Sequence, residues 1–106
     1  MEATLAVLFA QAEAKKRKKA LEWKMREFLM EANSTREITP NNDDVYIVIE
    51  GDSDVMVSSN TGVYNQPNAP EYQHVHSGQI TLKNVATSTK KMRFLQAMFL
   101  KTEQTA

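Results

Sequence analysis

A chain of 106 residues and 12.0 kDa has room for one domain with one modest core, because small chains bury only about two-thirds of their unfolded surface. Thirteen Lys and Arg residues balance thirteen Asp and Glu residues, and this zero net charge excludes a histone-like polycation and a wholly acidic protein. The absence of cysteine excludes a disulfide framework, a thiol nucleophile and thiolate metal sites.

The N-terminal third of the chain has the composition of a helix. Residues 3–32 contain no Gly or Pro and are rich in Ala, Leu, Lys, Glu, Met and Arg, the strongest helix formers. The pattern predicts one long helix within residues 1–33, which ends at Asn33-Ser34-Thr35 because these side chains compete for backbone hydrogen bonds.

Targeting signals are not expected in this segment. Its apolar run, residues 4–12, is about half the length that a bilayer-spanning helix needs. Glu2 occupies the region where a secretory signal carries positive charge. We therefore expect no membrane contact and no signal peptide, and a location in a virion or the cytoplasm.

The rest of the chain, residues 34–106, is predicted to form a small antiparallel β body. Beta-branched and aromatic runs alternate with turn residues, and a neighbouring hairpin would leave an open edge that a final apolar strand could cover. Residues 90–101 fit both helical and strand periods. We favour a strand there, because a strand would cover this open edge. Strands are expected at residues 45–49, 55–57, 72–76, 79–83 and 90–101, with a polar loop at 58–71 in which residues 63–64 could pair briefly.

Ser77-Gly78 lies between two of these strands and is interpreted either as the centre of a tight hairpin or as a bulge within one strand. The predicted fold class is therefore α+β, with a long N-terminal α-helix followed by a small antiparallel β-sheet.

The predicted helix has two apolar faces. At about 100° per residue, one face holds Leu5, Leu8, Phe9 and Ala12, and a nearly opposite face holds Leu21, Met25, Phe28 and Ala32. One flat partner cannot bury both faces. The second face would pack on the chain's own sheet, and the first would form an interface with another subunit.

The basic collar separates the two faces and consists of Lys15, Lys16, Arg17, Lys18 and Lys19. These five charges encircle more than one helical turn, so this segment cannot lie in an apolar core. A break near Lys16, giving two helices folded on one core, is the alternative to a continuous helix. The collar could also contact the phosphates of a nucleic acid.

Charge is segregated along the chain. Residues 1–33 carry a net charge of +2, residues 34–76 carry −6, and residues 77–106 carry +4. Acidic loops of one copy could meet the basic end of another, or the same groups could pair within one chain.

His74 and His76 are the only histidines, and a spacing of two residues on a strand directs both side chains to the same face. His74-Val75-His76 resembles the His-x-His arrangement of trimeric phage spike and fibre proteins, which hold an iron ion on a three-fold axis. The cupin pattern also begins with His-x-His, but the acidic ligand that should follow is missing here, with Gln79 nearest. The alternative interpretation is two solvent-exposed strand histidines, so these residues are candidates for a metal site that we do not otherwise expect.

No catalytic constellation emerges from the sequence, and we expect neither an enzyme nor a bound cofactor. The leading hypothesis is a small assembly or structural protein that forms a homo-oligomer or binds other protein subunits, as an accessory component of a phage virion. The alternative is a small regulator or inhibitor that binds nucleic acid or a host protein through the basic collar.

Overall fold

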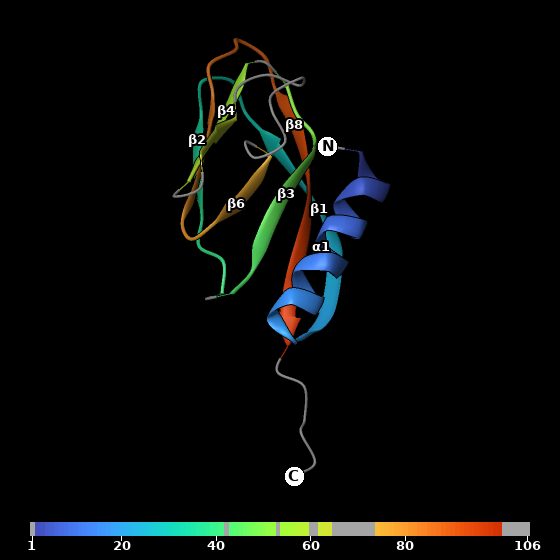
Figure 1. The fold of residues 1–106 in the computed structure, drawn as a ribbon. Helices are drawn as coiled ribbons and strands as arrows, with labels where there is room; N and C mark the ends of the chain where they lie inside the picture. The colour runs from blue at the N-terminus through green and yellow to red at the C-terminus, as the bar shows by residue number, and fades with distance from the viewer. Residues whose placement is uncertain (1, 42, 53, 60–61, 65–73, 101–106) are drawn as a thin grey trace.

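Figure 1 shows a computed structural model of the chain, in which residues 2–41, 43–52, 54–59, 62–64 and 74–100 are described. Within these ranges the N-terminal helix is followed by antiparallel strands, which confirms the α+β class, including the expected C-terminal strand. The elements are α1 (Ala3–Arg17), β1 (Ala20–Met30), β2 (Thr35–Ile38), β3 (Val45–Glu50), β4 (Val55–Ser59), β5 (Gly62–Tyr64), β6 (Val75–Ser77), β7 (Ile80–Asn84) and β8 (Lys90–Leu100).

The strands form two four-stranded sheets. The first sheet has the order β1-β8-β3-β6 and the second has the order β2-β7-β4-β5, with every neighbouring pair antiparallel. β1 and β8 are both 11 residues long and pair along their whole length, from Ala20 opposite Leu100 to Met30 opposite Lys90. This is the longest strand pair among the described residues.

The first sheet is the middle layer of three. The second sheet covers one of its faces and α1 covers the other (Figure 1). Between the sheets, Phe94 of β8 is fully buried and makes edge-to-face contacts with Phe28 and Tyr46, with ring centroids 5.7 and 6.0 Å apart. Such aromatic pairs add to the stabilisation that comes from apolar burial alone.

α1 packs on the first sheet through a stripe of alanines. Ala6, Ala10 and Ala14 are buried, and their spacing of four residues places them on one side of the helix. Their small side chains let the helix lie close to the sheet. The apolar residues that they meet are Val45, Ile47, Leu95, Ala97 and Phe99.

The helix ends much earlier than the sequence predicts. Lys18 adopts a left-handed conformation with φ of 55°, and the amides of Lys18 and Lys19 bond back to the carbonyls of Lys15 and Ala14 at 3.2 and 3.0 Å. This arrangement satisfies carbonyl groups at the end of the helix. The expectation of one helix up to residue 33 is therefore wrong, and the chain breaks close to the position given by the two-helix alternative.

The segment after the break is a strand, which neither alternative predicted. Leu21 and Met25 pack on the side of α1, whereas Phe28 and Met30 lie between the sheets. One strand therefore contributes side chains to the apolar cluster under α1 and to the apolar cluster between the sheets. Pairing with β8 over the full strand outweighs the local helix preference. β1 therefore belongs to the same sheet as β3, β6 and β8.

The chain switches sheets at Ser77-Gly78. β6 pairs with β3 in the first sheet, whereas β7 belongs to the second sheet, so both the hairpin and the bulge interpretations are wrong. Gly78 has φ of 71°, which glycine adopts without steric cost, and this allows the corner. Of the predicted loop 58–71, residues 58–59 belong to β4 and 62–64 to β5, which pairs with β4, and the remainder lies outside the described residues.

Candidate interaction surface

The outer face of α1 carries apolar side chains into solvent. Leu5 and Leu8 are 53% and 54% exposed, and Ala12 is exposed on the same side of the helix, opposite the buried alanine stripe. Phe9, the fourth residue of the predicted interface face, is half-buried against the first sheet. We call Leu5, Leu8 and Ala12 the outer helix face. The opposite side of the helix lies against the first sheet, because its alanine stripe packs there.

β1 is a terminal strand of the first sheet, and within the described residues no strand pairs with its outer edge. Two of its large apolar side chains, Trp23 and Leu29, are 46% and 66% exposed. Sequence reasoning missed this edge. The alternation of Leu21, Trp23 and Met25 with charged residues is a signal for a strand, but not for its place at the edge of a sheet. A long uncovered edge is a template for pairing with another strand.

The basic collar lies in the last turn of α1 and in the two residues that follow it, and not in the middle of a longer helix. Arg17 Nε lies 3.1 Å from Glu13 Oε1, and the Arg17 guanidinium lies over the Phe99 ring at 4.3 Å. Lys19 Nζ donates to Asp43 Oδ2 at 2.9 Å, and this hydrogen bond and charge lower the pKa of the Asp43 carboxyl. Two collar residues thus make contacts within the chain.

The other three collar residues, Lys15, Lys16 and Lys18, are exposed. They lie in and just after the last turn of α1, where positive charge also complements the helix dipole. They are the part of the collar that is available to a partner.

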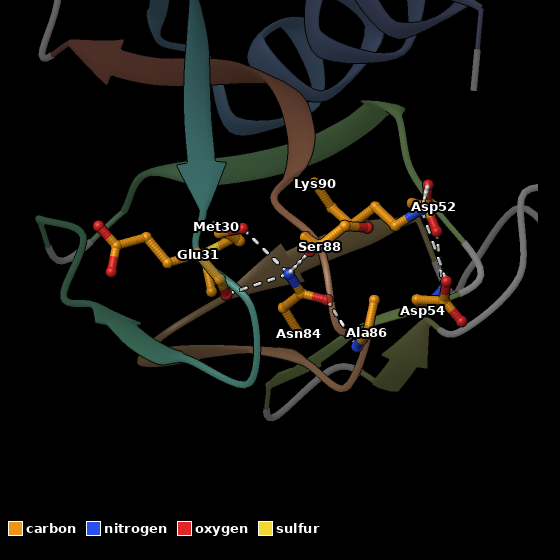
Figure 2. Close-up of polar contacts among 8 residues, drawn as sticks. All are labelled: Met30, Glu31, Asp52, Asp54, Asn84, Ala86, Ser88 and Lys90. Atoms are coloured by element: carbon orange, nitrogen blue, oxygen red, sulfur yellow. Dashed lines mark hydrogen bonds and ion pairs between the residues drawn. The ribbon is translucent and has the colours of Figure 1, made fainter.

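Part of the segregated charge pairs within the chain. Lys90 Nζ lies 3.6 Å from a carboxylate oxygen of Asp52 and of Asp54, as Figure 2 shows. Arg93 Nη1 similarly lies 3.3 Å from Glu50 Oε1. The basic C-terminal strand is therefore joined to the acidic middle of the same molecule.

His74 and His76 are buried, with 5% and 0% of their surfaces exposed. His76 pairs with core residue Tyr46 across the strands, so its side chain lies between the sheets, where Ser59 Oγ is 2.7 Å from its Nδ1. The exposed-histidine alternative is wrong, because both side chains are buried. Among the described residues, no group of three His, Asp or Glu side chains is placed to hold a metal ion.

A partly buried chain of polar side chains joins β1 to its neighbours. Gln96 Nε2 donates to Asp44 Oδ2 at 2.9 Å, and Arg26 Nη1 lies 3.1 Å from Gln96 Oε1 and 3.3 Å from the Tyr46 hydroxyl. Burial raises the pKa of the Tyr46 phenol above its usual value, although the nearby Arg26 charge opposes the shift. These partners lie on three segments that are far apart in the chain, namely β1, β8 and the start of β3, so no local pattern predicted the contacts.

Asn84 ties the far end of β1 to the loop before β8 (Figure 2). Its side-chain amide donates to the carbonyls of Met30, Glu31 and Ser88 at 3.0, 3.1 and 3.0 Å. Its Oδ1 accepts from the Ala86 amide at 2.9 Å. The side chain is fully buried, so these bonds replace its hydration.

The outer side of the second sheet has an open depression of about 300 Å³. Its lining is polar, and Gln79 Nε2 donates to Glu37 Oε2 across it at 3.1 Å. Sites for small molecules are typically enclosed and mostly apolar, which this depression is not. The lining residues are Glu37, Ser58, Ser59, Gln79 and Thr81.

Comparisons of the chain with protein-family models, with curated proteins and with solved structures found no match. Within the described residues, no helix combines the length and the apolar character needed to cross a membrane.

Proposed function

We propose that the protein is a small, non-enzymatic assembly protein, whose copies join with one another and with other protein subunits. The observation that carries this proposal is the outer helix face, where Leu5 and Leu8 are more than half exposed on a helix whose other side is fully packed. Adjacent exposed apolar residues on one helix face are typical of a surface that a partner covers. A phage virion is the setting that the sequence analysis predicts for such a protein.

Two further features support the proposal. The terminal strand β1 adds exposed Trp23 and Leu29 to the apolar surface next to α1. The partly buried polar chain and the hydrogen bonds of the Asn84 side chain hold β1 in place at two points. The outer edge of β1 is therefore held in one conformation. A preorganised surface binds more tightly than one that must be ordered on binding.

Native mass by light scattering over a range of protein concentrations tests the proposal. We expect the mass to rise above the 12.0 kDa of one chain, and to fall when Leu8→Glu places a charge on the outer helix face. Gln11→Glu is the matched control, because it adds the same charge at another exposed position of α1. A mass of one chain at every concentration would contradict self-assembly.

Nucleic-acid binding is the second candidate function, and it is favoured by the exposure of Lys15, Lys16 and Lys18 at one end of α1. It predicts binding to a DNA duplex that weakens steeply as salt is added, since phosphate contacts release counterions. Substituting these three lysines by glutamine should abolish that binding. Binding that survives the substitution would remove this candidate.

A further inference from the structure

The outer edge of β1 has a sequence that is complementary to itself. Side chains alternate between the two faces of a strand, so Leu21, Trp23 and Met25 share the side of α1. Glu22 and Lys24 project from the other face and are both exposed. One face of this edge is thus apolar, and the other carries opposite charges two residues apart.

Symmetry limits how two such edges can pair. A two-fold axis perpendicular to the sheet makes the strands antiparallel and places opposite residues on the same face. Centring the axis on Trp23 sets Trp23 opposite its own copy. Leu21 then lies opposite Met25, and Glu22 lies opposite Lys24, with each of these two pairs occurring twice.

Neighbouring registers lack this match. An axis at Glu22 places two glutamates opposite each other, and an axis at Lys24 does the same for two lysines. An axis at Met25 sets Lys24 against Arg26 and Trp23 against Glu27. Like charges directly opposite each other destabilise a strand pair, so the Trp23 register satisfies both faces and these three do not.

We propose that a second copy of this chain pairs with β1 edge to edge, with Trp23 on the two-fold axis. The first sheet of one copy and the first sheet of the other, each four-stranded, then form one continuous eight-stranded sheet. Both copies of α1 lie on the same face of it. This inference deepens the proposed assembly function and rests on it, since it names a second copy as one partner and the β1 edge as its contact surface, separate from the outer helix face. The geometry also gives the half-exposed Trp23 a partner.

Charge reversal at two exposed positions tests the register. Glu22→Lys sets lysine against lysine twice, and Lys24→Glu sets glutamate against glutamate twice. Each variant alone should raise the dimer dissociation constant about tenfold or more, from the loss of two attractive pairs and the gain of two repulsive ones. An equimolar mixture of the two variants should form a heterodimer, because every pair across the axis then has opposite charges.

The measurement is sedimentation velocity of each full-length variant, of the mixture and of the double variant Glu22→Lys/Lys24→Glu, with circular dichroism as the check on folding. Restored dimer in the mixture and in the double variant supports the inference. If the unaltered chain assembles and the single variants assemble equally well, the β1 edge is not the contact, and the assembly function stands without it. If the unaltered chain is a monomer throughout, both proposals fail.

Discussion

β1 and β8 are equal in length and paired along their whole extent, yet they have opposite environments. β8 lies between β1 and β3, and most of its residues from 92 to 99 are buried. β1 is the terminal strand, and only Phe28 and Met30 among its residues are buried. Place in the sheet therefore decides what each strand can do: β8 holds the fold together, and β1 offers a free edge.

The largest loss of stability is expected from a substitution at the centre of β8. Replacing Phe94 by alanine should lower the free energy of unfolding by about 3–5 kcal/mol, because the substitution leaves a cavity between the sheets. Trp23→Ala on β1 should cost about 1 kcal/mol, since that side chain is already 46% exposed. Urea unfolding at a dilute protein concentration measures both losses. Equal losses would contradict the assigned difference between the strands.

The next largest effect is expected where β1 ends. Asn84→Ala removes the donor to three carbonyls and the acceptor for one amide, and should cost about 2–3 kcal/mol in the free energy of unfolding. Ser88→Ala is the control, because Ser88 accepts through its backbone carbonyl, which the substitution keeps. Thermal unfolding of the two variants gives the comparison. A Ser88→Ala loss as large as that of Asn84→Ala would refute the role of the Asn84 side chain.

The Tyr46 phenol, which contacts Arg26 of β1, should make the stability of the fold depend on pH. Burial raises the pKa of the Tyr46 phenol, so the fold favours its neutral form. The resulting stability is complete below the unfolded value near 10 and is lost as the pH rises through the raised folded value. Ultraviolet titration of the three tyrosines should show one late step that is missing in Tyr46→Phe. A late step that persists in that variant would assign it to another tyrosine.

The smallest effect is expected at the exposed start of β8. Lys90→Ala removes two ion pairs with Asp52 and Asp54, each with a separation of 3.6 Å and partly open to solvent. Such pairs contribute about 0–1 kcal/mol, and salt screens them. Unfolding of this variant and of the unaltered chain in low and high salt should show a difference that shrinks with salt. A difference that is large and independent of salt would contradict this assignment.

The sequence predicted the elements whose local pattern agrees with their final environment. Residues 45–49 form β3 because their β-branched composition suits a strand buried on both faces, and Gly62–Tyr64 pairs as expected. The helix start was also predictable from the helix formers near the N-terminus. Of the four residues predicted to form one helix face, Leu5, Leu8 and Ala12 are exposed, whereas Phe9 is half-buried against the first sheet.

The rest depends on contacts between residues far apart in the chain. Residues 20–30 are strong helix formers, and only their pairing with β8 makes them a strand. The burial of His74 and His76 depends on the tertiary packing around them, which a local spacing of two residues does not encode. The same holds for the free edge of β1, since an edge is defined by the order of strands in the sheet.

Amide hydrogen exchange along β1 and β8, at low and high protein concentration, tests the central claim most directly. In the dilute chain we expect exchange along β1 to alternate between slow amides that bond to β8 and fast amides that point outward, while the central part of β8 is slow throughout. In the concentrated protein the fast amides around Trp23 should become slow, because a second copy pairs with them. If these amides exchange at the same rate at both concentrations, β1 is not the edge through which the protein assembles.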